Sequence, residues 1–308
     1  MNITAAFLRL IRWQNLLFIA LTQILFYFCI VTPSLPSSYF EYSKSLSVSL
    51  LGWLVFASVL IAAAGYIIND YFDVNIDQVN KPDKMVVQRV ISRRWAIFFH
   101  LFFTIVGLMI SFYISYKTHK IIFLANVICA LLLWFYSTTF KKKLLSGNII
   151  ISALTAWTII VVYVAVNTSD VFSIQRIFKF MILYAGFAFI ISLVREAVKD
   201  MEDMVGDAKY NCRTMPIAWG IRASKVYVGV WLVVLIGALL VVQIYALMLG
   251  WWLSSIYSVF FIIVPLIIIV RKLFAAIEIK EYHSLSTYVK LIMLSGILSM
   301  IFIRIAIT

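Results

Sequence analysis

Charged side chains are scarce in this sequence. Asp, Glu, Lys and Arg together make up 13% of its 308 residues, whereas 64% of the residues are hydrophobic. A soluble domain averages about half apolar and about a quarter charged residues. The shortage of charge therefore excludes an ordinary soluble protein, and we find no soluble domain and no low-complexity tail along the chain.

Cysteine is also rare. The chain has three cysteines, Cys29, Cys129 and Cys212, an odd number without the spacing of a metal site. Cys29 and Cys129 lie in apolar runs, where we expect them to pack as small core residues. Alternating ten-residue strands are absent as well, which excludes a membrane β-barrel. The N-terminal stretch lacks a small-residue cleavage site, so we interpret it as a first span and not as a removable signal.

What the sequence does contain is a series of apolar runs, each long enough to cross the roughly 30 Å hydrocarbon core of a bilayer. Inside lipid the backbone must satisfy its own hydrogen bonds, which favours helices. We predict an all-α, polytopic membrane protein, a single domain over residues 1–308 with nine helices in a bundle around a central cavity. The predicted spans cover residues 14–33, 46–70, 95–116, 120–140, 148–167, 177–198, 224–247, 249–270 and 287–306.

The basic residues are distributed unevenly between the predicted loops. Of the 26 Lys and Arg residues, 18 fall in loops on one side of the membrane and six on the other, which leaves Arg195 and Lys290 inside spans. Because basic residues concentrate on the cytoplasmic side, we predict a cytoplasmic N-terminus and an external C-terminus. Topology also accounts for the formal charge of +13 without a nucleic-acid partner, and we expect none.

The acidic residues gather in two short segments. Nine of the 13 fall between Asp70 and Asp83 or between Glu196 and Asp207, each segment at the cytoplasmic end of a predicted span. The first cluster is Asn69, Asp70, Asp73 and Asp77, and the second is Asp200, Asp203 and Asp207. Spacings of three and four residues would put each set on one face of a helix that continues from the span.

Such clusters are costly without a cationic partner. Like charges four residues apart repel, and carboxylates at the C-terminal end of a helix oppose its dipole. Hard oxygen ligands suit Mg²⁺, which binds carboxylates together with substrate phosphates. Nearby cations would then suit the phosphates themselves: Lys84, Lys141, Lys142, Arg195, Lys199 and Arg213. One cluster alone is explained equally well as a solvated loop, but two with matching spacing at matching span ends favour a metal site.

At these residues the sequence resembles the UbiA superfamily of intramembrane prenyltransferases. The family's motifs, N-x-x-x-D-x-x-x-D and D-x-x-D-x-x-x-D, match Asn69, Asp73 and Asp77 and then Asp200, Asp203 and Asp207. The segments "FYSTTFKKKLLSGN" from Tyr136 and "RWQN" from Arg12 are also similar to family patterns. The chain departs from the family after the first motif, where "NKPDKMVVQRV" keeps Lys81 and Lys84 but lacks a Pro-Ser-Gly turn.

The resemblance implies Mg²⁺-dependent transfer of a prenyl group from an allylic prenyl diphosphate. It implies metal binding by Asn69, Asp70, Asp73, Asp77, Asp200, Asp203 and Asp207, with Asp73, Asp77, Asp203 and Asp207 also taking part in catalysis. It further implies that Lys84, Lys142, Arg195, Lys199 and Arg213 hold diphosphate, that Asn15 binds substrate, and that the ring of Tyr136 stabilises the allylic cation. Simpler roles stay open for two of them: Tyr136 as a packing or interfacial residue, and Asn15 as a hydrogen-bonding link between helices.

The sequence says less about the acceptor of the prenyl group than about its donor. The chain looks most similar to the branch of geranylgeranylglyceryl-phosphate geranylgeranyltransferases, which implies a geranylgeranyl donor and a phosphate-bearing lipid acceptor. The alternative is an aromatic quinone precursor of the dihydroxynaphthoate or hydroxybenzoate type. An ion-coupled transporter is a further alternative, but transporters place ionisable residues near the bilayer midplane. We expect a multi-pass protein in the lipid bilayer of a bacterial cell membrane, with the site facing the cytoplasm.

Overall fold

The computed structural model describes residues 2–35, 46–166 and 170–307, apart from the side chain of Lys84. Within these ranges, nine helices are long and apolar enough to cross a membrane. They are Trp13–Ser34, Val48–Asn80, Arg93–Lys117, Ile121–Thr138, Ser146–Ala165, Val171–Lys209, Gly220–Met248, Trp252–Ala275 and Ile279–Ile307. The predicted all-α architecture with nine spans is confirmed.

Two of the spans are continuous through a π-helical turn. The first consists of α2 (Trp13–Leu25), η1 (Phe26–Val31) and α3 (Thr32–Ser34), and the eighth of α12 (Trp252–Ser258), η4 (Val259–Ile263) and α13 (Val264–Ala275). The others are α5 (Val48–Asn80), α6 (Arg93–Lys117), α7 (Ile121–Thr138), α8 (Ser146–Ala165), α9 (Val171–Lys209), α11 (Gly220–Met248) and α14 (Ile279–Ile307). The short helices α1 (Ile3–Leu10) and α10 (Met215–Ala218) lie outside the spans.

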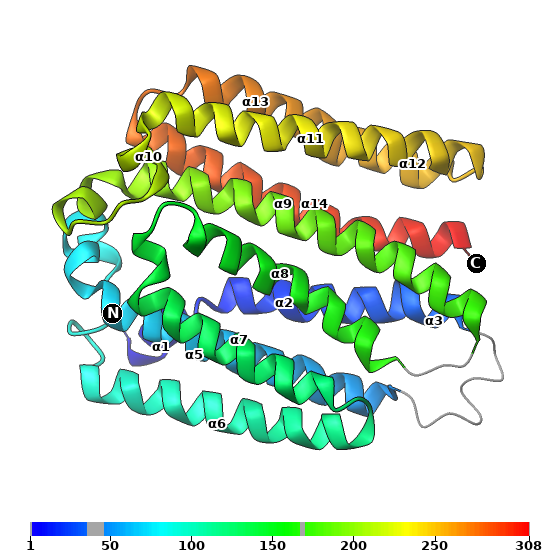
Figure 1. Cartoon of the computed structure of the whole chain (residues 1–308), viewed down its shortest axis with the longest axis horizontal. Coiled ribbons are helices and arrows are strands. Elements are labelled where there is room, and N and C mark those ends of the chain that lie inside the picture. Colours follow the sequence, from blue (N-terminus) through cyan, green and yellow to red (C-terminus); the bar gives the residue numbers. More distant parts are fainter. Residues whose placement is uncertain (1, 36–45, 167–169, 308) are drawn as a thin grey trace.

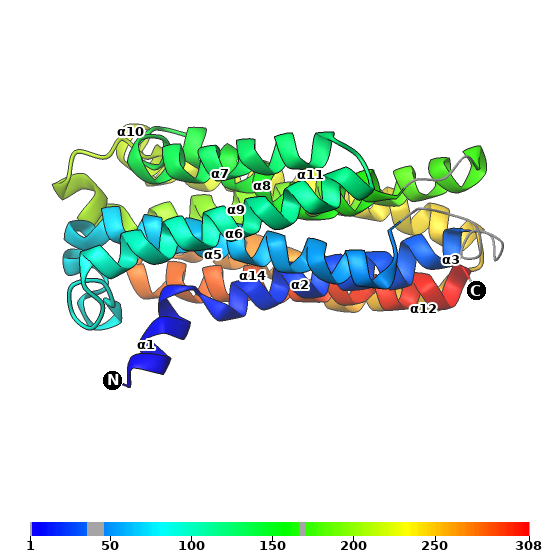
Figure 2. The same ribbon diagram turned by 90° about the horizontal axis from the view of Figure 1, so that it is seen from below.

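The long helices run side by side in one bundle (Figures 1 and 2). Helix α5 packs against α6 and α7, and α9 packs against α8, α11 and α14. The N-terminus and the turns after α5, α7, α9 and α13 lie at one end, and the C-terminus lies at the other (Figure 1). These turns carry the basic loop residues, so the bundle groups them as the sequence predicts. That this end faces the cytoplasm remains a prediction.

The two helices that carry the acidic clusters extend beyond their apolar segments. The predicted apolar spans end at residues 70 and 198. Helix α5 continues past the first of these to Asn80, and α9 continues past the second to Lys209. Ser47 caps α5 by accepting a hydrogen bond from the backbone N–H of Leu50 at 3.2 Å. Pro82 follows the end of α5, as expected because the residue before a proline disfavours helical dihedrals. Both acidic clusters therefore lie on helices, as their spacing predicts.

Apolar packing fixes the positions of these two helices. On α9, Ile191 and Val198 are buried in a cluster with Leu232 of α11 and Val289 of α14. At the N-terminal end of the bundle, Ile67 of α5 is buried in a second cluster that also holds the end of α1. In lipid such close packing, and not a hydrophobic driving force, is what holds helices together.

Helix α1 leaves the bundle at an angle to α2 (Figure 2). The bend lies at Arg12, whose φ of 50° is in the left-handed region that non-glycine residues rarely adopt. Such strained residues cluster at functional sites, where surrounding contacts hold them in place. The strain at Arg12 points to this end of the bundle as a candidate site.

Candidate active site

A cavity of about 1070 Å³ extends from the loop-rich end of the bundle into its interior. Its walls come from α2, α5, α7, α8, α9 and α14, and residues of both acidic clusters line it. Apolar side chains such as Leu133, Phe187 and Met293 line it as well. The cavity therefore combines charged groups with room for an apolar substrate.

The first acidic cluster is held by cations from two other elements. The Asn69 amide donates to Asp73 Oδ2 at 2.7 Å, and Lys141, in the turn after α7, forms an ion pair with Asp73. Arg12 donates to Asp70 Oδ1 at 2.8 Å and lies over the ring of Tyr66, 5.1 Å from its centroid. Arg12, whose backbone is in the left-handed region, is thus in direct contact with the first acidic cluster.

The second cluster is held in a similar way. The Lys81 ammonium lies 2.7 and 2.8 Å from the two carboxylate oxygens of Asp203. The Asn148 amide, at the start of α8, donates to Asp200 Oδ2 at 2.8 Å. Because Lys81 directly follows α5, its ion pair also brings the end of the first cluster's helix against the second cluster.

Asn80 fastens the ends of α5 and α9 to each other. Its Nδ2 donates to the carbonyl of Asp203 at 2.9 Å, and its Oδ1 accepts from the backbone N–H of Gly206 at 2.8 Å. A Cβ on Gly206 would lie 2.4 Å from the Asn80 oxygen, so only glycine permits this approach. We call this arrangement the Asn80 clasp. It sets the spacing between the two acidic clusters.

The carboxylates of the two clusters do not form a complete metal-binding site by themselves. Across the described residues, no group of three or more His, Cys, Asp and Glu side chains is placed to hold a metal ion. Two carboxylates, Asp77 and Asp207, have no hydrogen bond or ion pair to any described side chain. The carbonyl oxygen of Asn69 is buried and has no hydrogen-bond partner in the described protein. These free, hard oxygens fit a divalent cation of the Mg²⁺ type.

The pKa values of Arg12 and Lys81 keep these two side chains positively charged. Burial acts to lower the pKa of Arg12, but Asp70 and Tyr66 together outweigh it, and the pKa lies above its ordinary value. Burial likewise acts to lower the pKa of Lys81, and Asp203 raises it above the ordinary value. Both cations therefore stay protonated at neutral pH.

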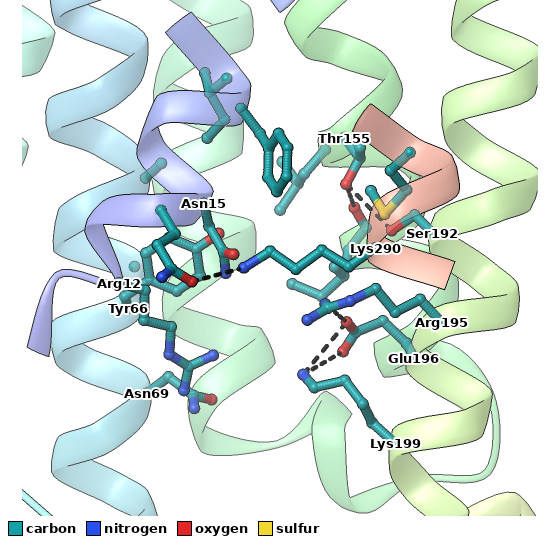
Figure 3. Close-up of a pocket in the computed structure, with 18 of the residues that line it drawn as sticks. Arg12, Asn15, Tyr66, Asn69, Thr155, Ser192, Arg195, Glu196, Lys199 and Lys290 are labelled. Carbon is teal, nitrogen blue, oxygen red and sulfur yellow. Dashed lines mark hydrogen bonds and ion pairs between the residues drawn. The ribbon is translucent and has the colours of Figure 1, made fainter. Parts of the chain in front are cut away.

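A second group of charges lies on α9 and α14 (Figure 3). Arg195 Nη1 is 3.1 Å from Glu196 Oε1, and Lys199 Nζ is 3.4 Å from both Glu196 oxygens. Lys290 extends from α14 across the cavity and donates to Gln14 Oε1 at 3.2 Å. Glu196 thus forms ion pairs with both Arg195 and Lys199.

The structure brings most of the predicted site residues together and leaves others outside. Asn15, beside Tyr66, lines the cavity, as do Tyr136, Arg195 and Lys199. Every predicted metal ligand also lines it: Asn69, Asp70, Asp73, Asp77, Asp200, Asp203 and Asp207.

Two predicted diphosphate-binding residues, Lys142 and Arg213, are not among the lining residues. The side chains of Lys142 and Arg213 are exposed outside the cavity, and the Arg213 backbone N–H donates to the Lys142 carbonyl at 2.8 Å. The side chain of Lys84 falls outside the described residues. The cavity instead receives Lys81 and Lys141, the neighbouring cations in the same two loops.

Sequence reasoning missed several lining residues. Arg12 was noted only within a family pattern, and Asn148 only as part of a Gly-Asn segment. Lys290 was counted inside a span and given no role, although an ionisable residue inside a membrane span is a signal of function. Asn80 lies three residues after the end of the first motif, and no feature of its position in the sequence indicated the clasp.

The fold and the cavity together define an intramembrane enzyme for an anionic substrate with an apolar part. The chain belongs to the UbiA prenyltransferase family, whose model matches residues 30–281. It is therefore a prenyltransferase and not an ion-coupled transporter, and it is an integral, multi-pass membrane protein.

Relatives of the chain share much of its length. A digeranylgeranylglyceryl phosphate synthase from Methanospirillum hungatei JF-1 is 31% identical over 220 residues, which cover 71% of this chain and 70% of that protein. A solved structure from work on digeranylgeranylglyceryl phosphate synthase in membranes is 25% identical, with a TM-score of 0.61, and covers 98% of this chain and 99% of that chain. A UbiA homologue from Archaeoglobus fulgidus bound to GPP and Mg²⁺ has a TM-score of 0.58 at 15% identity, covering 96% and 99%, which shows a shared fold.

Proposed function

We propose that this prenyltransferase moves a geranylgeranyl group from geranylgeranyl diphosphate to geranylgeranylglyceryl phosphate or a similar phosphate-bearing lipid. One observation carries the proposal: a single cavity joins both aspartate motifs to an apolar interior and holds cations beyond those paired with the motifs. A phosphate on each substrate would account for this surplus of positive charge. The similarity to digeranylgeranylglyceryl phosphate synthases supports the same acceptor.

The proposal includes Mg²⁺ as the cofactor. Asn69, Asp73 and Asp77 would hold one ion and Asp203 and Asp207 another, with Asp70 and Asp200 beside them. The free oxygens of Asn69, Asp77 and Asp207 support this arrangement. When bound, such ions neutralise the diphosphate and make it a better leaving group. The Archaeoglobus fulgidus homologue, which binds GPP and Mg²⁺, supports the choice of metal.

In this proposal the protein's own side chains position the donor. Arg12, Lys81 and Lys141 already contact the motif carboxylates, so an arriving diphosphate would meet a rim of cations. The apolar lining would receive the prenyl tail. It would also keep water away from C1, because water would otherwise trap the allylic cation as an alcohol. The ring of Tyr136 lines the same cavity and would face that cation.

The bond changes balance without a further reactant. The C1–O bond of the prenyl diphosphate breaks, and diphosphate leaves with the electron pair. The free hydroxyl oxygen of the acceptor forms a new bond to C1. Its proton passes to a carboxylate of the second motif, Asp200, Asp203 or Asp207, all of which line the cavity.

We further propose that the entire chain, residues 1–308, acts as one domain, with the site facing the cytoplasm of a bacterial cell. The basic residues that gather at the site's end of the bundle support the sidedness, through the preference of basic loops for the cytoplasm.

Turnover of single acceptors by the purified protein tests this function. Geranylgeranyl diphosphate, Mg²⁺ and geranylgeranylglyceryl phosphate should yield digeranylgeranylglyceryl phosphate by mass spectrometry, with release of diphosphate. A chelator should stop the reaction and added Mg²⁺ should restore it. If no prenylated phospholipid forms while an aromatic quinone precursor is prenylated, the proposed acceptor is wrong.

A further inference from the structure

The cations that line the cavity form two sets with different partners. Arg12, Lys81 and Lys141 each make a direct ion pair with an aspartate of one of the two acidic clusters, and we call them the outer set. Arg195, Lys199 and Lys290 make no ion pair with an aspartate of either cluster among the described residues, and we call them the inner set. The outer set is thus already paired with the carboxylates at the proposed diphosphate end of the site, whereas the inner set is not paired with them.

The inner set has too little negative charge around it. Glu196 is the carboxylate that pairs with both Arg195, at 3.1 Å, and Lys199, at 3.4 Å. The Nε of Arg195 is buried and has no hydrogen-bond partner in the described protein. A buried donor without a partner costs free energy, so this arginine can still gain from an additional acceptor.

Lys290 adds a further unbalanced charge from α14, the helix that packs beside α9. Its ammonium donates to the amide oxygen of Gln14 at 3.2 Å and lies 5.3 Å from the centroid of the Phe18 ring. No carboxylate among the described residues forms an ion pair with it. Arg195 and Lys199, which line the same cavity, carry charges of the same sign. Figure 3 shows these side chains converging on the same space from α9 and α14.

We infer that Arg195, Lys199 and Lys290 form an anion subsite that binds the phosphate monoester of the acceptor, apart from the donor's diphosphate. Three cations against one carboxylate leave two positive charges, and a phosphate monoester carries about −1.5 to −2 at pH 7. This inference rests on the proposed function. It reassigns Arg195 and Lys199, which sequence reasoning gave to the diphosphate, and it gives Lys290 a role.

The subsite would also orient the reaction. A phosphate held by the inner set would direct the neighbouring glycerol hydroxyl toward the motifs, where the C1–O bond breaks. An acceptor without a phosphate would lose this anchor and the affinity that comes from its charge-assisted hydrogen bonds. The inner set therefore predicts selectivity for phosphorylated over unphosphorylated acceptors.

The test compares Lys290→Gln with Lys179→Gln, the same change at an exposed lysine of α9 that does not line the cavity. Each protein is assayed with geranylgeranylglyceryl phosphate and with the dephosphorylated alcohol. We expect Lys290→Gln to raise KM for the phosphorylated acceptor roughly 10- to 100-fold, the range for loss of a hydrogen bond to a charged group. KM for the prenyl diphosphate should stay within about twofold, and Lys179→Gln should match the wild type.

The ratio of kcat/KM for the two acceptors provides an internal readout. General damage to the fold lowers both values together, whereas loss of the subsite lowers only the value for the phosphorylated acceptor. Lys290→Arg keeps the charge and should retain most of the preference. Inorganic phosphate at the acceptor's concentration should leave the wild-type rate unchanged, because it lacks the lipid part; competitive inhibition there would assign the subsite to free phosphate instead.

The outcomes separate this inference from the proposed function. If the wild type does not prenylate the phosphorylated acceptor, both are overturned. If it does and Lys290→Gln keeps the wild-type ratio, the subsite is wrong and the proposed function stands. If Lys290→Gln instead raises KM for the prenyl diphosphate, the lysine belongs to the donor site and the inference is wrong.

Discussion

Breaking the Asn80 clasp should disturb both stability and catalysis. Asn80→Ala removes two hydrogen bonds between α5 and α9, at 2.9 and 2.8 Å. Neutral hydrogen bonds contribute about 0.5–1.5 kcal/mol each, so the free energy of unfolding should fall by about 1–3 kcal/mol. The clasp also sets the spacing between the motifs. A displacement near 1 Å at a reacting centre can cost about 100-fold in rate, so kcat should fall by about 10- to 100-fold.

Gly206→Ala should break the same contact from the other side. The new Cβ would meet the Asn80 side chain at 2.4 Å, and the asparagine can turn away only by giving up both hydrogen bonds. The cost in the wild type should therefore approach that of Asn80→Ala. In the Asn80→Ala background the three atoms nearest to the new methyl group are gone. Alanine is also a better helix former than glycine by up to about 1 kcal/mol. The effect of Gly206→Ala should thus change from harmful to neutral or stabilising.

A double-mutant cycle measures this change of sign. Unfolding in detergent and turnover would be followed for the two single variants and the double variant. Gly186→Ala is the matched control, because Gly186 also lies in α9 and a Cβ added there would meet no atom within 4 Å. It should behave alike in both backgrounds. Equal damage from Gly206→Ala with and without Asn80 would refute the clasp.

Three further predictions concern single groups. Asp73→Asn should lower kcat by about 100-fold or more while the protein stays folded, because a charged ligand of the proposed metal is lost. The prediction is wrong if the variant turns over as fast as the wild type, both with and without a chelator. Lys81→Met should cost about 1 kcal/mol of stability near pH 8. Since the folded pKa of Lys81 is raised, its contribution is present below the ordinary pKa and lost as the pH rises through the folded value, so a deficit that grows in alkali would contradict the ion pair. Burial raises the pKa of the Cys212 thiol to about 11, so at pH 8 maleimide should label it about 100-fold more slowly in the folded than in the denatured protein, as measured by peptide mass spectrometry; equal rates would show that the thiol is accessible.

The spans and the motif helices follow from simple periodicities. Apolar runs of membrane length predict nine spans, and nine are found in the described chain. Spacings of three and four residues predict that the clusters continue the helices, and α5 and α9 do continue through them. These features depend on local sequence, which is why sequence alone could predict them.

The side chains that complete the site depend on tertiary packing. Lys141 and Lys142 are neighbours of the same type, yet Lys141 pairs with Asp73 inside the cavity and Lys142 is exposed. Their directions are set by the turn between α7 and α8, and no pattern in "FKKK" distinguishes them. The partner of Asn80 is likewise distant in the chain, because Asp203 lies on another helix.

The most direct test of the proposed function is a competition between acceptors in one reaction. Purified protein, geranylgeranyl diphosphate and Mg²⁺ would be mixed with equal amounts of geranylgeranylglyceryl phosphate, its dephosphorylated alcohol, hydroxybenzoate and dihydroxynaphthoate. Mass spectrometry would then compare the products. We predict digeranylgeranylglyceryl phosphate as the main product, absent when a chelator is added. A prenylated aromatic as the main product would contradict the proposed acceptor and the phosphate subsite.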